Sequence, residues 1–344
     1  MRRFVPICAW SLIVFSVIGC GGQSAQLSLL RQADLYGAAP SGYVDGTPSQ
    51  ARFANPANVA VGPDGAVYVA DYDNNAVRMI SPNGRVSTLT KQANFGQPFG
   101  LTLSPDGYLY VSTDVNDQGV KNPTSGTIWR IDIGRKITTV LKVNLGRPRG
   151  IVAVSKTEIV MTDIIHHTVS LLDTLTGTVS VLAGVTDQSG HVNGNGSTAR
   201  FNRPYGLCVL PNGNVLVADA NNNCIRQVTM AGDVTDFAGT TSSGQDNGSA
   251  LSSTFKTPQG VTTSGGLVFV ADTGNHVVRM ISAGQVSTIA GDGTAGFVDA
   301  PGLQAEFYGL EGLSIYPGTT RLWVSDGNGG DGSDFNHVRE IRVP

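Results

Sequence analysis

The chain has 344 residues, of which 40% are hydrophobic and 14% charged, a composition too apolar for a disordered protein and sufficient for a full core. Its formal net charge is −3, and no run of Lys or Arg follows Arg2 and Arg3, so we expect no nucleic-acid partner. The 44 glycines indicate many turns.

The first residues of the chain predict an export signal. Arg2 and Arg3 form a short positive region, and residues 4–18 form an apolar stretch shorter than the roughly 20 residues that a spanning helix needs. The run VIGC, ending at Cys20, resembles the bacterial lipobox, in which the chain is cut before a cysteine that has been acylated on sulfur. This resemblance implies that residues 1–19 are a lipoprotein signal peptide and that the acylated Cys20 anchors the protein to a lipid bilayer.

The residue after the anchor bears on location. Gly21 stands where Asp would act as a retention signal in Gram-negative sorting, so we expect an exported, envelope-anchored protein, at the outer membrane if the host is Gram-negative. Residues 20–32 then form a lipidated N-terminus and linker, and residues 33–344 form one repeat domain.

Six copies of one pattern follow, the first beginning at Asn55. Each copy has a Pro-x-Gly entry, a strand, a turn, a second strand that ends in a run like VAD, and further strands. Apolar residues alternate with period two, and Gly, Asn and Pro mark the turns, as in short strands joined by tight turns. Four strands in roughly 40 to 55 residues match one propeller blade. The sequence therefore predicts an all-β fold, a six-bladed β-propeller.

The two ends of the chain are predicted to share the last blade. The sixth copy shows three strands before the chain stops, whereas residues 33–38, ADLYGA, resemble the strand that closes the fifth copy. We expect this N-terminal strand to complete the last blade, because pairing there removes an exposed sheet edge.

The repeated V-A-D, N-H and P-x-G motifs, including GNHVVRMI at residues 274–281, resemble the NHL-repeat family of six-bladed propellers. The ARF segments at Ala51 and Ala199 resemble those of bacterial NHL proteins and of the teneurin propeller. The resemblance covers essentially the whole mature chain. It implies the fold and leaves the function open, because this fold carries enzymes, scaffolds and sensors.

One residue in each repeat is predicted to lie at the mouth of the central channel, namely the residue inside the P-x-G entry. These positions are Ala57, Phe99, Arg149, Tyr205, Gln259 and Glu311, and Arg147 and Arg203 lie beside two of them. Their chemistry differs from blade to blade, which favours a binding rim for a protein, peptide or glycan over a purely structural role. The alternative is that they are ordinary exposed loop residues.

An aspartate ends the second strand of most copies. The five are Asp71, Asp163, Asp219, Asp272 and Asp326, whereas the second copy has Thr113 there with Asp114 beside it. Because one carboxylate per blade can accept backbone N–H groups of the following loop, we interpret them as structural.

The sequence offers little for catalysis. The lactonases of the gluconolactonase and regucalcin type hold calcium at channel-facing positions, where this chain offers Glu311 and a displaced Asn58. Related lyases use zinc held by histidines, but His167 and His276 match asparagines in other copies, which leaves His166 and His191. We therefore expect a non-enzymatic binding scaffold with no required cofactor. The alternative is a metal-dependent hydrolase or lyase of the gluconolactonase-like class.

One loop could hold calcium. The segment DGNGGDGSD contains Asp326, Asn328, Asp331 and Asp334 among glycines, and such oxygen ligands suit this ion. It departs from the regular calcium-loop spacing, because Gly330 stands where the third ligand belongs. The alternative is a flexible polar loop.

Two cysteines remain in the repeat domain. Cys208 is predicted on a first strand and Cys224 at the start of a third strand, two ladder spacings or about 9.6 Å apart. A disulfide needs Cα atoms within about 7 Å, so we expect two buried thiols.

Overall fold

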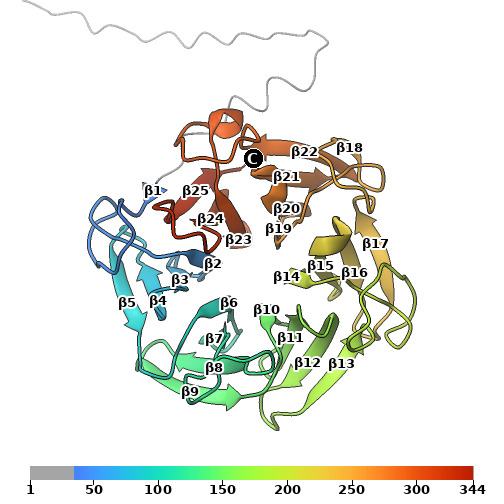
Figure 1. Ribbon diagram of the computed structural model, residues 1–344, viewed down its shortest axis with the longest axis horizontal. Helices are drawn as coiled ribbons and strands as arrows, with labels where there is room; N and C mark the ends of the chain where they lie inside the picture. The colour runs from blue at the N-terminus through green and yellow to red at the C-terminus, as the bar shows by residue number, and fades with distance from the viewer. Residues whose placement is uncertain (1–34, 344) are drawn as a thin grey trace, which may run out of the picture.

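The structure is a computed structural model that describes residues 35–343. It shows six sheets arranged as a closed ring around a central channel, with the chain running from blade to blade in order (Figure 1). The prediction of an all-β six-bladed propeller is confirmed. The predicted signal peptide and Cys20 lie outside the described residues. No helix within residues 35–343 is long and apolar enough to cross a membrane.

Each of the first five blades is an antiparallel sheet whose four consecutive strands run from the channel outward. Blades one to three comprise β2 (Pro56–Val61), β3 (Val67–Asp71), β4 (Ala76–Ile80) and β5 (Val86–Thr90); β6 (Pro98–Leu103), β7 (Tyr108–Thr113), β8 (Thr127–Asp132) and β9 (Ile137–Lys142); and β10 (Pro148–Ala153), β11 (Glu158–Asp163), β12 (Thr168–Asp173) and β13 (Val179–Ala183). Blades four and five comprise β14 (Pro204–Val209), β15 (Val215–Asp219), β16 (Cys224–Val228) and β17 (Val234–Ala238), then β19 (Gly260–Ser264), β20 (Leu267–Asp272), β21 (Val277–Ser282) and β22 (Gln285–Ala290), with β18 (Gly248–Ser249) outside β22. Within residues 35–343, three short 3-10 helices lie in loops, η2 (Ala220–Asn222), η3 (Thr273–Asn275) and η4 (Gly302–Gln304).

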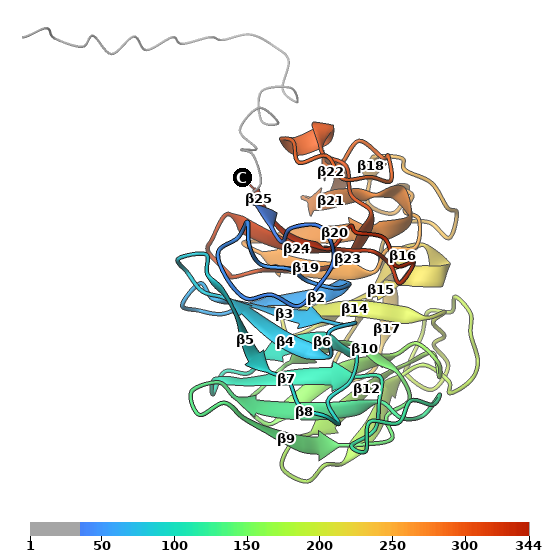
Figure 2. The same ribbon diagram turned by 60° about the vertical axis from the view of Figure 1, so that its left-hand side comes forward.

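Blade six joins the two ends of the chain. Its strands β23 (Gly309–Ile315), β24 (Arg321–Gly327) and β25 (His337–Arg342) are completed by β1 (Leu35–Tyr36), which pairs Leu35 with Arg339 and Tyr36 with Val338. The Tyr36 ring also packs 5.1 Å from Trp323. Figures 1 and 2 both place β1 beside β25. The predicted closure by an N-terminal strand is thus confirmed.

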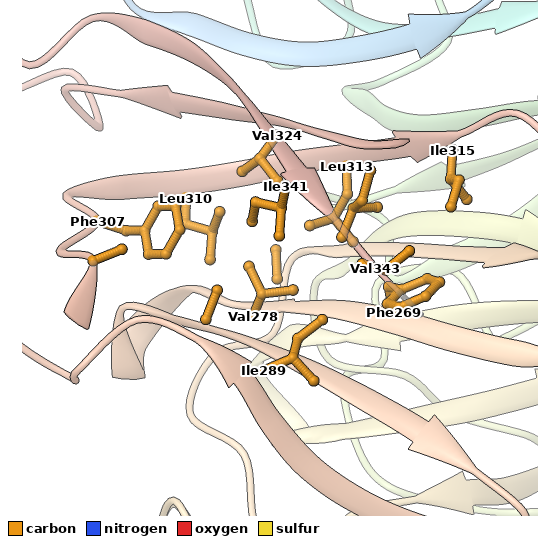
Figure 3. Packing of buried hydrophobic residues seen from close by; sticks show 14 residues of the cluster. Phe269, Val278, Ile289, Phe307, Leu310, Leu313, Ile315, Val324, Ile341 and Val343 are labelled. Carbon is orange, nitrogen blue, oxygen red and sulfur yellow. The ribbon is translucent and has the colours of Figure 1, made fainter. Parts of the chain in front are cut away.

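The core lies between neighbouring blades. Second strands such as β3 and β15 are buried along their whole length, which explains why their sequences are apolar on both faces. Figure 3 shows one such layer, in which Phe269 and Val278 of blade five meet Leu313, Val324 and Ile341 of blade six. Burying each large apolar side chain contributes about 1.5–3 kcal/mol, so blade contacts supply most of the stability.

A buried ion pair repeats in four blades. It joins the aspartate that ends the second strand to an arginine on the third: Asp71–Arg78 (2.7 Å), Asp219–Arg226 (3.0 Å), Asp272–Arg279 (2.8 Å) and Asp326–Arg339 (3.1 Å). Each aspartate also accepts a backbone N–H, as Asp71 does from Ala54 at 2.8 Å. The structural role of these carboxylates is confirmed. In these blades, however, the N–H donor belongs to the loop that enters the blade and not to the loop after the second strand.

Candidate functional site

The mouth of the central channel gathers the variable residues of the P-x-G entries. The channel encloses a cavity of about 620 Å³, and its lining includes Phe99, Arg149, Tyr205, Gln259 and Glu311. Ala57, the sixth predicted position, is buried outside this lining, and Asn58 takes its place. Five of the six predicted residues therefore converge.

The glycine of each entry allows this convergence. A Cβ on Gly150 would lie 2.3 Å from the Tyr205 carbonyl oxygen, and a Cβ on Gly206 would lie 2.4 Å from that of Gln259. Neighbouring innermost strands can approach this closely only because the side chain is absent. A register shift at the same point, between Pro148 and Ile151 in blade three, marks a bulge in the ladder. Glycine and bulge together crowd the variable residues around one opening.

Asp114 is at the centre of a cluster of hydrogen bonds and ion pairs at the channel mouth. Its buried carboxylate accepts two hydrogen bonds of 3.0 Å from Arg149 Nη1 and Nη2, in a bidentate pair. The Tyr72 hydroxyl donates to it at 2.6 Å, and Arg147 Nη2 lies 3.1 Å away. Lys121, in the loop between β7 and β8, lies 3.7 Å away. Burial acts to raise the pKa of Asp114, but Arg149, Tyr72 and Arg147 hold it below its ordinary value, so the carboxylate stays charged.

Sequence reasoning missed Asp114 as a site residue. In blade two, Thr113 replaces the repeated aspartate, and Trp129 replaces the arginine, donating from Nε1 to Thr113 Oγ1 at 2.9 Å. The blade therefore needs no Asp–Arg pair, and the neighbouring carboxylate serves an arginine of the next blade instead. This break in the repeat is the signal that could have identified it.

Aromatic rings brace the arginine. The Arg149 guanidinium lies 4.0 Å over the Phe99 ring. Phe99 in turn meets the edges of Tyr72 and Tyr205 at centroid distances of 6.2 and 6.0 Å. The guanidinium is thus fixed in orientation between the Asp114 carboxylate and the Phe99 ring, and Asp114 balances its positive charge.

Two polar atoms at the mouth are buried without a hydrogen-bond partner, Arg149 Nε and Gln259 Oε1. An unpaired buried polar group costs about 1–3 kcal/mol, so Gln259 Oε1 favours a ligand that supplies the missing bond. The Nε atoms of the structural arginines Arg78, Arg279 and Arg339 are also without a partner, so Gln259 Oε1 is the more specific of the two signals. The two atoms at the mouth provide one donor and one acceptor.

Glu311 adds a group that titrates near neutrality. Burial raises its pKa to about 7, with Arg149 acting in the opposite direction and Asp114 and Asp73 reinforcing the rise. Around neutral pH this side chain is therefore divided between a neutral acid, which donates, and a carboxylate, which only accepts.

The remaining predicted residues lie elsewhere or in other roles. Arg147 belongs to the Asp114 cluster, whereas Arg203 is absent from the cavity lining and its backbone N–H donates to His167 Nδ1 at 3.0 Å. Cys208 and Cys224 are both buried and free, which confirms the expectation of two thiols.

The residues of the proposed calcium loop each have other partners. Asp326 pairs with Arg339, and the Asn328 side chain accepts from the Gly330 N–H at 2.9 Å. Asp331 accepts from the Tyr308 hydroxyl, and Asp334 accepts from the Ser41 N–H at 3.0 Å. The structure does not gather the three carboxylates around one point within the described chain, and calcium binding stays a prediction.

A closed ring of six blades, entered through P-x-G segments and stabilised by buried Asp–Arg pairs, defines a six-bladed propeller of the NHL type. Residues 38–242 match the family model of the teneurin NHL domain, and the chain belongs to this family. The resemblance inferred from the motifs is therefore confirmed.

Curated relatives match parts of the chain. The Arabidopsis thaliana protein SUPPRESSOR OF QUENCHING 1, chloroplastic, is 27% identical over 189 residues, which are 54% of this chain and 15% of that protein. Human NHL repeat-containing protein 2 is 31% identical over 123 residues, 32% of this chain and 17% of that protein. The chain thus corresponds to less than a fifth of the length of either relative.

Solved structures share the propeller over most of the chain. A protein of unknown function from Bacteroides thetaiotaomicron superposes with a TM-score of 0.72 at 18% identity, covering 91% of this chain and 76% of that one. An auxiliary nutrient binding protein from Bacteroides ovatus has a TM-score of 0.69 at 18% identity, covering 90% and 76%. At these identities the likeness shows the fold.

Proposed function

We propose that this protein is a non-enzymatic binding scaffold of the cell envelope, which holds a protein, peptide or glycan at the channel mouth. One observation carries the proposal: Arg149, fixed by Asp114 and Phe99, and Gln259 present buried polar atoms without partners beside the half-buried ring of Tyr205. A ligand would find donors, acceptors and ring faces already in position, which lowers the entropy cost of binding.

The chemistry of the mouth suits a ligand with polar and apolar faces. Aromatic rings stack on sugars and on apolar side chains, while Arg149, Gln259 and Glu311 meet hydroxyl, amide or carboxylate groups. That a propeller of similar shape is a nutrient binding protein supports a binding role.

We do not favour a metal-dependent hydrolase or lyase. Among the residues that line the cavity, Glu311 is the only acidic one and none is histidine. A catalytic metal would need about three protein ligands, and one carboxylate without a histidine falls short of that number.

The proposal includes the membrane anchor at Cys20. Acyl chains on this residue would hold the chain at a bilayer, with about 15 residues before β1. Such a tether reaches roughly 50 Å when fully extended, which keeps the propeller near the membrane.

The test is binding to defined arrays of glycans and peptides. We expect wild-type protein to retain specific ligands, and Tyr205→Ala and Gln259→Leu to weaken the same ligands at least tenfold. Gln259→Leu is informative because removing the unpartnered, buried Oε1 atom of Gln259 should not destabilise the fold.

The control is Tyr316→Ala, because Tyr316 lines the opposite end of the channel, after the last residue of β23. This variant should bind like wild type. Equal binding by all variants would place the ligand away from the mouth. If a retained ligand is converted to product, the protein is an enzyme and the scaffold proposal is wrong. If no ligand is retained on any array, a scaffold for glycans or peptides is contradicted.

A further inference from the structure

Blade four departs from blades one and five at three positions that the strand register makes equivalent. The first position is opposite the aspartate that ends the second strand, in the register of the sheet. The second position is opposite the buried arginine on the third strand. The third position lies three residues before the glycine that bridges to the fourth strand. In blade four these are Cys224, Asp236 and His191; their counterparts, in the same order, are Ala76, Thr88 and Tyr43 in blade one and Val277, Thr288 and Gln245 in blade five.

The three departures meet in space. His191 Nε2 lies 2.9 Å from Asp236 Oδ1, and the ligand atoms of His191, Cys224 and Asp236 all lie within 4.8 Å of one another. Within residues 35–343, no other group of three His, Cys, Asp or Glu side chains shows this spacing. The thiol is buried, whereas the His191 and Asp236 side chains are 28% and 29% exposed, so the group opens to solvent on one side.

We propose that His191, Cys224 and Asp236 form a Zn²⁺ site at the outer edge of blade four. Imidazole nitrogen, thiolate sulfur and carboxylate oxygen are the ligands that zinc takes in proteins. Tetrahedral zinc with bonds of about 2.0–2.3 Å holds its ligand atoms roughly 3.3–3.8 Å apart, so closure of about 1 Å completes the site. Three protein ligands leave a fourth position for water.

The charges around the group also favour a divalent cation. Arg226 is shared, since its Nη1 lies 3.0 Å from Asp219 and its Nε lies 2.8 Å from Asp236. With neutral His191 and a protonated thiol, the one arginine and two carboxylates carry a net charge of −1. Zinc binding with loss of the Cys224 proton brings this local charge to zero, which avoids leaving a buried charge unbalanced.

A second layer of contacts orients the carboxylate. Asn193 Nδ2 donates to Asp236 Oδ2 at 3.0 Å, and Asn193 Oδ1 accepts from Arg226 Nη2 at 2.6 Å. Contacts of this kind fix metal ligands in their working geometry. A catalytic role for the thiol is disfavoured, because Cys224 is buried and a substrate could not reach its sulfur.

The test uses the purified chain and two metals. We expect one Zn²⁺ per chain in competition with a chromophoric chelator, and a thiolate-to-metal charge-transfer band when Co²⁺ replaces zinc. Cys224→Ala, Asp236→Thr and His191→Tyr install the residues of blade one, which the same fold accommodates at equivalent positions. Each should weaken zinc binding at least about 100-fold, and Cys224→Ala should abolish the cobalt band.

Cys208→Ala is the matched control, because it removes the other buried thiol of the same blade and should keep both signals. Thermal unfolding without metal shows whether each variant is folded. Added zinc should raise the Tm of wild type and of Cys208→Ala, and it should leave the Tm of the three ligand variants unchanged. Failure of the wild type to bind one zinc would overturn the site. So would a cobalt band that survives Cys224→Ala, or zinc affinity unchanged in folded His191→Tyr or Asp236→Thr.

Discussion

At Asp114 a single carboxylate joins two blades. Four of the five repeated aspartates pair with an arginine of their own blade and Asp163 pairs with His166, whereas Asp114 pairs with Arg149, which is 35 residues further on, in blade three. The pair is buried, so its two charges depend on each other and on the hydrogen bonds around them.

Asp114→Ala should therefore destabilise the protein by about 3–5 kcal/mol, because it leaves the Arg149 charge buried and unpaired. The free energy of unfolding from denaturant titration measures the effect. In the double variant Asp114→Leu with Arg149→Met, the buried pair is removed as a whole, while the side chains of Arg147 and Lys121, 29% and 42% exposed, can turn to solvent, so much of the loss should be recovered. A single variant that loses less than about 1 kcal/mol would show that solvent screens this pair.

Glu311 gives the protein a pH dependence of known sign. Its pKa is about 7 in the fold against an ordinary value of 4.5, so the folded state holds its proton more tightly than the unfolded state. The stability that this group contributes is full below about pH 4.5 and is lost as the pH rises through 7.

Glu311→Gln keeps the neutral shape and removes the titration. We expect equal stabilities near pH 4, and the variant to be more stable than wild type by about 1–2 kcal/mol at pH 8, less than the full linkage value because solvent reaches the mouth. Unfolding curves across this pH range give the difference in unfolding free energy between variant and wild type. Groups that titrate alike in both proteins do not contribute to this difference. A constant difference at all pH values would contradict the raised pKa.

At the scale of elements, β1 closes the ring, and within residues 35–343 two of its residues pair with β25. Leu35 and Tyr36 cover the edge of β25, and Tyr36 is 6% exposed and packs against Trp323. Blade six is thus held by residues from opposite ends of the chain, and loosening this strand exposes a sheet edge.

Tyr36→Ala should lower the free energy of unfolding by about 3 kcal/mol, as for other large aromatic side chains removed from a core. Tyr43→Ala is the control, because Tyr43 is 42% exposed and its removal should cost less than about 1 kcal/mol. Equal losses in the two variants would mean that ring closure does not depend on packing at β1.

At the scale of the whole molecule, the proposed anchor at Cys20 and the ring closure lie near each other along the chain. Cys20 precedes β1 by 15 residues, so a lipid on Cys20 would hold the propeller by its closing blade. The channel mouth would then work within a short distance of the bilayer.

Cys20→Ala should move the protein from the membrane fraction to the soluble fraction, since no acyl chain can then be attached. Fractionation of cells with detergent extraction measures the shift, and Cys8→Ala, in the predicted signal, should leave the protein with the membrane. Membrane retention of Cys20→Ala would contradict the lipid anchor.

Much of the fold was predictable because its signals are local and repeated. Period-two alternation, the Pro-x-Gly entries and the resemblance of residues 33–38 to the last strand of blade five predicted six blades and their closure. The rim residues were predictable for the same reason, since each holds the same place in its repeat. The prediction for Ala57 was wrong, because Asn58, one residue later, lines the channel in blade one.

The sequence by itself determined the repeat, and therefore the fold and the set of residues that face the channel, because alternation and turn residues act within a few positions. Only the tertiary structure decided which partners these residues have. The Asp114–Arg149 pair, the burial of Glu311 and the meeting of His191 with Asp236, 45 residues apart, all depend on how blades and loops pack. Such contacts join residues that no local pattern relates, so their chemistry appears only once the ring has closed.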